Sequence, residues 1–208
     1  MNTRYFTPEG FMQALAKHAL TGIFGVAIIQ PSQICAAELS VPQIERALFC
    51  DHFEDVYPVL TNLTAWMEQE KAAGRFTRES LTTLQNGSRA VLDYKYVEPV
   101  KIMGYQVVGL NNSVGALPAL AVFFNASPAQ LRQPFEARGF TFQCLNSKDL
   151  QGETCEGGSA VPEDALKNAG QVGKYRFVAN IVSGAALLPR GMTLVSCTIL
   201  PAEGNPFR

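Results

Sequence analysis

The stretch "CDHFED", residues 50–55, groups side chains of the kinds that bind divalent cations. On a helix, Asp51 and Asp55 share one face, and His52 lies three residues before Asp55. One imidazole and two carboxylates could hold a metal ion if another element supplied further ligands. His52 is the only histidine after residue 18, so no second imidazole can strengthen such a site. The pattern therefore favours a solvated acidic helix face, with a metal site at Asp51, His52 and Asp55 as the alternative.

The sequence lacks the other common catalytic patterns. It contains no G-x-S-x-G nucleophile elbow, no G-x-G-x-x-G phosphate-binding loop and no C-x-x-C redox pair. A serine or cysteine nucleophile of the usual kind would have to draw its proton acceptor from His52 alone. We therefore predict no catalytic residues and no cofactor. A periplasmic hydrolase that uses carboxylates, or a metal centred on His52, is the competing interpretation.

Four of the five cysteines lie after residue 37, and an even number of thiols in an exported chain indicates disulfides. Four cysteines allow three pairings. We favour Cys144–Cys155, which closes the polar loop "LNSKDLQGET", and by elimination Cys50–Cys197. A structural zinc site is not indicated, because zinc-binding cysteines normally occur in closely spaced pairs and none is present.

The prediction of export comes from the N-terminal stretch of residues 17–37. Lys17 and His18 precede an apolar run from Ala19 to Ile29, which is shorter than the roughly 20 residues of a membrane-spanning helix. A proline and the small residues of positions 35–37 follow. This order is typical of a secretory signal peptide. We predict cleavage after Ala37, with Ala36 as the second choice. We also predict no stable membrane anchor after cleavage, and a periplasmic or secreted location. A buried N-terminal helix or an uncleaved anchor is the alternative.

Composition narrows the classes of partner. The chain of 208 residues is 47% hydrophobic and 17% charged, with a formal net charge of −1 and no block of like charge. A nucleic-acid-binding protein would normally carry a basic stripe that neutralises phosphates, and an anionic membrane surface would require a similar cluster. We therefore predict no nucleic-acid partner and expect a protein partner instead. The oligomeric state and the start codon, Met1 or Met12, stay open.

Helical signals dominate residues 38–88. Ser40 and Gln43 form a capping box with a proline in the first turn. Apolar residues then recur at steps of three and four from Phe49 to Met67, which predicts one buried helical stripe. Pro58 interrupts this run, so we expect a kink or two helices that meet near Tyr57. A further short helix is predicted after Thr77, carrying Leu81 and Leu84.

Strand signals dominate residues 89–208. Six runs are rich in β-branched and aromatic residues and are separated by turn residues: "AVLDYKYVEPVKIM", "YQVVGL", "LPALAVFF", "FTFQCL", "KYRFVANIV" and "MTLVSCTIL". Between the third and fourth runs, Ser127 and Gln130 form a second capping box. It opens a helix with Leu131 and Phe135 facing inward.

These elements predict an α+β fold, with N-terminal helices packed on a mostly antiparallel β-sheet and one inserted helix, in the order β-β-β-α-β-β-β. We divide the chain into a signal peptide, residues 1–37, and a single domain, residues 38–208. Within that domain, residues 38–88 form the helical part and residues 89–208 form the sheet part.

Two loops are the candidate binding surfaces. The loop between the paired cysteines would present Lys148, Asp149 and Glu153, and the loop from Ser183 to Gly191 would present Leu187, Leu188 and Arg190. A stapled loop loses less entropy on binding, and exposed leucines favour contact with a partner. We therefore predict an exported, disulfide-stabilised, non-catalytic protein that binds another macromolecule, as a periplasmic inhibitor, immunity factor or envelope-complex subunit. The leucines could instead fold into the core.

A small-ligand carrier is a third class. It would require a cavity between helices and sheet, lined by Phe123, Phe124, Phe135 and Trp66. Core packing is the simpler interpretation of these four aromatic residues.

Overall fold

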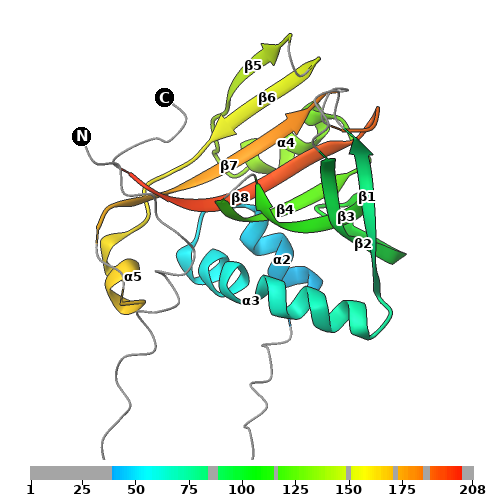
Figure 1. Ribbon diagram of the computed structural model, residues 1–208. Helices are drawn as coiled ribbons and strands as arrows, with labels where there is room; N and C mark the ends of the chain where they lie inside the picture. Colours follow the sequence, from blue (N-terminus) through cyan, green and yellow to red (C-terminus); the bar gives the residue numbers. More distant parts are fainter. Residues whose placement is uncertain are drawn as a thin grey trace, which may run out of the picture. The chain divides into compact units, whose positions relative to one another are not determined.

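A computed structural model describes residues 39–83, 89–114, 117–148, 151–170, 173–184 and 188–202 (Figure 1). Every described residue belongs to one compact unit, Cys35–Arg208. The predicted signal peptide, residues 1–37, lies outside the described residues. Within the described ranges, no helix combines the length and hydropathy that crossing a membrane requires.

Eight strands form one antiparallel sheet, in the order β1-β2-β3-β4-β8-β7-β6-β5. Two four-stranded meanders, β1–β4 and β5–β8, are therefore joined by the pairing of β4 with β8. The strands are β1 (Phe76–Thr83), β2 (Arg89–Ile102), β3 (Tyr105–Val114), β4 (Leu117–Phe124), β5 (Gln143–Ser147), β6 (Gly152–Gly157), β7 (Tyr175–Ser183) and β8 (Thr193–Pro201).

Four described helices accompany the sheet: α2 (Val41–Leu48), α3 (Phe53–Ala72), α4 (Pro128–Glu136) and α5 (Glu163–Asn168). Helices α2 and α3 lie together against one side of the sheet (Figure 1). Their apolar stripe and the inward residues of α4 share one core with the central strands. The predicted α+β class, with an antiparallel sheet and an inserted helix, is confirmed.

Both capping boxes form as predicted. The backbone N–H of Ser40 donates to Oε1 of Gln43 at 2.8 Å, and that of Ser127 donates to Oε1 of Gln130 at 2.9 Å. These bonds satisfy N–H groups that a helix start leaves without intrahelical partners. The inserted helix α4 is thereby fixed at its first turn, and its Leu131 side chain is completely buried in the core.

The helical break occurs earlier than the sequence suggested. Pro58 lies inside the continuous helix α3, and the chain instead bends between α2 and α3, where Cys50 has a left-handed φ of 61°. A non-glycine residue at positive φ is uncommon and needs support from its surroundings. Cys50 has such support, because its side chain is bonded to Cys197 in the central strand β8. The expected meeting of two helices near Tyr57 is therefore wrong.

Two strands were not expected. Residues 76–83 form β1, where we predicted a short helix after Thr77, and the supposed loop between Cys144 and Cys155 is largely the β5–β6 hairpin. Both segments are polar and short, so neither carries a clear strand periodicity. Pairing with a neighbouring strand, which is a tertiary effect, outweighs local propensity in both places.

Candidate functional site

The structure contains two disulfides, Cys50–Cys197 and Cys144–Cys155, which is the pairing that the sequence favoured. The first links residues 147 positions apart, and the second links residues 11 positions apart. They differ in surroundings as well as in span. The two disulfides therefore lie in two different environments.

The Cys50–Cys197 disulfide is part of the hydrophobic core. Both residues have 0% exposure. The carbonyl oxygen of Val178 lies 3.5 Å from the Cys50 sulfur, and that of Thr198 lies 3.9 Å away. The bond ties the junction between α2 and α3 to β8, and only backbone carbonyl oxygens supply polar contacts to its Cys50 end among the described residues.

The Cys144–Cys155 disulfide crosses the β5–β6 hairpin. The two cysteines are direct partners in the antiparallel register. Cys144 lies on the sheet-edge strand β5 and is exposed, whereas Cys155 on β6 has 0% exposure. The hairpin extends beyond the helices at one end of the sheet (Figure 1). This disulfide therefore has one sulfur-bearing residue open to solvent and one residue in the core.

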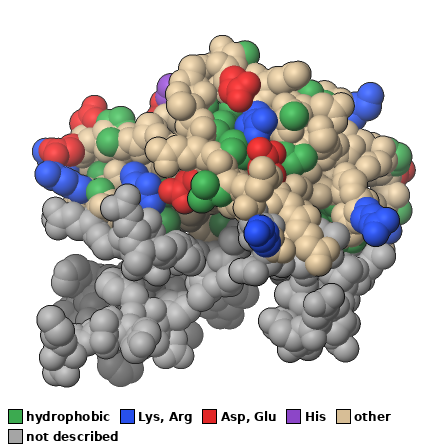
Figure 2. All heavy atoms as spheres, turned by 90° about the horizontal axis from the view of Figure 1, so that it is seen from above, with side chains coloured by type: hydrophobic (Ala, Val, Ile, Leu, Met, Phe, Trp, Pro, Cys, Tyr) green, Lys and Arg blue, Asp and Glu red, His purple; other side chains and the backbone are tan. Residues whose placement is uncertain are grey.

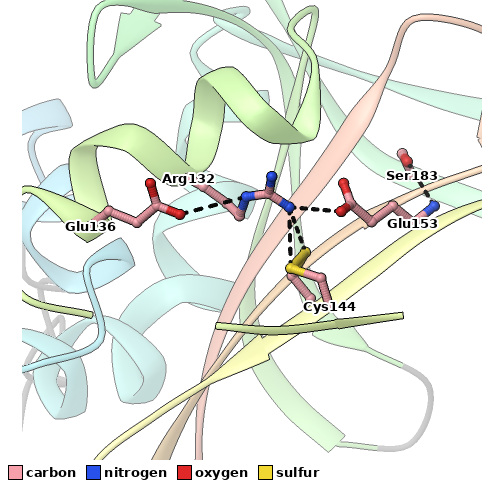
Figure 3. The surroundings of a disulfide bond; sticks show 6 residues. Arg132, Glu136, Cys144, Glu153 and Ser183 are labelled. Carbon is pink, nitrogen blue, oxygen red and sulfur yellow. Dashed lines mark hydrogen bonds and ion pairs between the residues drawn. A yellow bond between two sulfur atoms is a disulfide. The ribbon is translucent and has the colours of Figure 1, made fainter. Parts of the chain in front are cut away.

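Arg132, on α4, binds this disulfide (Figure 3). Its Nη1 lies 3.1 Å from the sulfurs of both Cys144 and Cys155. The same Nη1 donates to Oε1 of Glu153 at 2.7 Å, and Nε lies 3.7 Å from Oε1 of Glu136. No sequence pattern linked Arg132 with the cysteines. Its only local signal was the i,i+4 spacing to Glu136, which is ordinary on a helix surface.

The grouping of Cys144, Glu153 and Cys155 brings three potential metal-ligand types within 4.8 Å of one another. Both sulfurs are committed to the disulfide, and the guanidinium of Arg132 contacts all three residues. A cation in this position competes directly with a metal ion. In the oxidised protein the guanidinium of Arg132, and not a metal ion, therefore binds this cluster.

The turn of the β5–β6 hairpin packs closely against the end of β7. A Cβ added to Gly152 would lie 2.1 Å from the carbonyl oxygen of Ser183 and 2.4 Å from Cα of Gly184. The next residue, Glu153, donates its backbone N–H to Oγ of Ser183 at 3.2 Å. Only glycine permits so close a backbone approach. The hairpin turn and the segment after β7 are therefore held together.

This contact brings the two candidate loops to one groove, which we name the Arg190 groove. One lobe, of about 380 Å³, lies between the hairpin turn at Gln151, the first residues of α4 and the segment from Pro189 to Thr193. A second lobe, of about 360 Å³, continues to residues 95–99 of β2. Asn125, Arg190 and Met192 line both lobes. The sequence did not indicate that these loops meet.

The predicted binding residues have different fates. Lys148 and Arg190 are exposed. Glu153 is half-buried against Arg132. Asp149 and Leu187 lie outside the described residues.

Leu188 corrects the expectation of an exposed leucine pair. It is only 5% exposed and packs with Phe123 in a small apolar cluster, completed by Val108, Met192 and Leu194, that is separate from the main core. The loop gains more free energy by burying this side chain than by exposing it. Leu188 therefore anchors the loop that presents Arg190.

The alternative metal site at Asp51, His52 and Asp55 is not assembled. Helix α3 begins at Phe53, so the three residues do not share a helical face. Oδ2 of Asp51 pairs with Nη1 of Arg138 at 3.4 Å, and Oδ1 of Asp55 pairs with Nε of Arg46 at 3.0 Å. Each carboxylate is therefore neutralised by a different arginine, although His52 lies 4.0 Å from Asp51.

The aromatic residues of the carrier hypothesis do not surround a common space. Phe124, Phe135 and Trp66 belong to the main core, whereas Phe123 packs with Leu188 in the separate cluster. They contribute to packing on two different sides of β4.

Tyr96 lines the second lobe of the groove. Its hydroxyl oxygen is buried and has no hydrogen-bond partner among the described residues. Burial, assisted by the negative charge of Glu70, raises the pKa of Tyr96 far above its ordinary value. The phenol therefore stays protonated well beyond neutral pH, which excludes a role as a proton acceptor there.

One face of the molecule is mixed in charge. Figure 2 shows acidic and basic side chains in small interspersed groups on the visible face, separated by uncharged surface. Such a surface gives little long-range attraction to a polyanion.

Comparison of the chain with protein-family models, with curated proteins and with solved structures gave no match.

Proposed function

We propose that this is an exported protein that binds a partner protein at the Arg190 groove. The observation that supports this most directly is that the hairpin turn and the segment after β7, which are distant in sequence, line one groove with an exposed arginine between its two lobes. Concave surfaces that combine apolar walls with a few polar groups are the usual setting for recognition.

The walls of the groove are fixed before any partner arrives. The Cys144–Cys155 disulfide staples the hairpin, and Gly152 holds its turn against Ser183. Leu188 anchors the opposite wall by packing against Phe123. Preorganised loops lose little conformational entropy on binding, so more of the contact energy remains as affinity.

Arg190 suggests the chemistry of the partner. Its guanidinium offers a planar set of donors suited to a carboxylate, and arginine is common among the residues that dominate binding energy. The apolar side chain of Met192 borders the same two lobes. We therefore propose that an acidic side chain flanked by apolar residues, on a partner protein, occupies the groove.

Export is the second part of the proposal. Disulfides persist in oxidising compartments, so the two disulfides are consistent with a periplasmic or extracellular location. The intact mass of the protein purified from its native compartment tests this: a chain lacking residues 1–37 supports export, and a full-length chain with free thiols contradicts it.

Site-specific photocrosslinking in the native host tests the binding surface. A photoreactive amino acid at Gln151 or Arg190 is expected to give one discrete higher-mass adduct with a protein partner. The same amino acid at Lys167, which is exposed on α5, is the matched control and should not give that adduct.

The charge of the groove provides a second readout. Arg190→Glu should abolish the adduct from position 151, and Arg190→Lys should retain part of it, because an ammonium keeps the charge but loses the planar donors. Equal adducts from positions 151 and 167, or no effect of Arg190→Glu, would contradict a groove-specific partner.

A further inference from the structure

We infer that Cys144–Cys155 is a thiol–disulfide exchange site, reduced by a dithiol, in which Arg132 stabilises the departing thiolate. The inference does not depend on the proposed partner. It depends on three features of the described residues: an exposed cysteine, a buried one, and a guanidinium in contact with both sulfurs.

Solvent access determines which sulfur is attacked. Cys144 is exposed on the sheet-edge strand β5, whereas Cys155 has 0% exposure. An incoming thiolate can therefore approach Cys144. Its sulfur forms a new S–S bond with Cys144, the Cys144–Cys155 bond breaks, and the electron pair of that bond leaves on Cys155 as a thiolate.

The second half of the exchange completes the balance. The other thiolate of the dithiol attacks its own partner sulfur in the mixed disulfide and expels Cys144 as a thiolate. The dithiol is thus oxidised to a disulfide, and Cys144 and Cys155 receive two electrons; the protons are exchanged with solvent. The reductant is a small dithiol or a protein with two neighbouring thiols.

Arg132 lowers the barrier to the first half. The charge that forms on Cys155 is in a buried position, where an unpaired anion is unfavourable. Nη1 of Arg132 already lies 3.1 Å from that sulfur, so its positive charge is in place before the bond breaks. A better-stabilised thiolate leaves faster.

Two carboxylates reduce the stabilisation that Arg132 can give to the thiolate. Glu153 accepts a hydrogen bond from the same Nη1 at 2.7 Å, and Glu136 lies 3.7 Å from Nε on the other side of the guanidinium. Both reduce the net positive charge near the sulfurs. Glu153 is the more important of the two, because it shares the nitrogen that contacts the sulfurs (Figure 3).

The Cys50–Cys197 disulfide is an internal reference in the same molecule. It is completely buried, and carbonyl oxygens rather than a guanidinium lie near its Cys50 sulfur. The negative ends of those dipoles oppose the formation of a thiolate. We therefore expect the two disulfides to respond very differently to the same reductant.

The experiment is a timed reduction of the folded, oxidised protein with dithiothreitol. Samples are quenched in acid and alkylated with a mass-tagged maleimide, and the labelled cysteines are identified by peptide mass spectrometry. We expect Cys144 and Cys155 to be labelled at least about ten times faster than Cys50 and Cys197. Equal rates for the two pairs would overturn the inference.

Variants of Arg132 separate charge stabilisation from simple anchoring of the hairpin. If the guanidinium stabilises the thiolate, Arg132→Met should slow the reduction of Cys144–Cys155 roughly three- to tenfold, and Arg132→Lys should recover part of the loss. If Arg132 only anchors the hairpin, its removal should expose the disulfide and accelerate the reduction. An unchanged or faster reduction in Arg132→Met therefore overturns the inference.

Glutamine substitutions of the two carboxylates provide a matched pair of variants. Glu153→Gln should accelerate the reduction, whereas Glu136→Gln, which also removes one charge but is farther from the sulfurs, should change it less. Circular dichroism confirms that each variant remains folded. If both substitutions have the same effect, the charge on Nη1 does not control the exchange, and the role assigned to Arg132 fails.

Discussion

The two disulfides of this protein occupy opposite extremes of environment. Cys50–Cys197 lies in the core, joins distant parts of the chain and has backbone carbonyl oxygens beside its Cys50 sulfur. Cys144–Cys155 joins neighbouring strands of one hairpin, has an exposed end and contacts a guanidinium. A bond of the same chemistry therefore stabilises the fold in one place and is available for exchange in the other.

The difference shows that the span of a disulfide and its accessibility are independent properties. Span determines how much conformational entropy the bond removes from the unfolded chain. Accessibility and nearby charge determine how readily a thiol can cleave it. In this molecule the long-span bond is the protected one, so reduction of the exposed bond leaves the main connection between helices and sheet intact.

The largest expected effect is the loss of the buried disulfide. Replacing both Cys50 and Cys197 with alanine should lower the free energy of unfolding by about 4–5 kcal/mol, because the bond closes a span of 147 residues. Urea titration followed by circular dichroism measures this change. A loss below about 1 kcal/mol would mean that the bond does not constrain the unfolded chain as its span requires.

The exposed disulfide should matter less to stability. Replacing both Cys144 and Cys155 with alanine should cost about 3 kcal/mol, since the loop spans only 11 residues. The photocrosslink from position 151 should weaken in the same variant, because the hairpin that carries Gln151 is no longer stapled. If this pair costs more than the Cys50–Cys197 pair, the comparison between the two disulfides is wrong.

The turn of the hairpin offers a test without cysteine. Gly152→Ala should lower the free energy of unfolding by about 1–3 kcal/mol, because the new Cβ would lie 2.1 Å from the carbonyl oxygen of Ser183. It should also weaken the crosslink from position 151.

Gly139→Ala is the control for this substitution. Its added Cβ meets nothing within 4 Å, and only its φ of 85° is unfavourable to alanine. It should therefore destabilise the protein through backbone strain and leave the crosslink unchanged. Loss of the crosslink in both variants would show that general destabilisation, rather than movement of the hairpin, is responsible.

The smallest expected effect concerns the ionisation of the buried Tyr96 hydroxyl at alkaline pH. Burial and Glu70 raise the pKa of Tyr96 above its unfolded value of 10.0, so the unfolded chain loses this proton first as the pH rises. The contribution of Tyr96 to the free energy of unfolding is therefore complete below pH 10 and is lost as the pH rises further. The wild type should lose up to about 1.4 kcal/mol per pH unit above pH 10 from this group.

Tyr96→Phe should remove that part of the alkaline loss and change stability little at neutral pH, since the buried hydroxyl has no hydrogen-bond partner among the described residues. Urea titrations at pH 8 and pH 11 measure both values. Tyr57→Phe, at a half-buried position on α3, is the control. Parallel losses in the wild type and Tyr96→Phe would show that the Tyr96 hydroxyl is not protected.

Local sequence signals determined where α2 and α4 begin and the class of the fold, but not the start of α3 at Phe53. The capping boxes at Ser40 and Ser127 predicted where α2 and α4 begin, because capping involves residues only three positions apart. Runs of β-branched residues similarly indicated the central strands. The cysteine count and the short span of one pair were enough to favour the disulfide pairing that the structure contains.

Tertiary structure alone decided the rest. Strand pairing converted residues 76–83 and 152–157 into β1 and β6 although their polar sequences carry no strand periodicity. The contact of Arg132 with both sulfurs and the meeting of two loops at Arg190 each join residues from separate elements. A sequence pattern records the spacing of neighbours along the chain. The fold brings distant residues together, so the chemistry of this site is visible only in three dimensions.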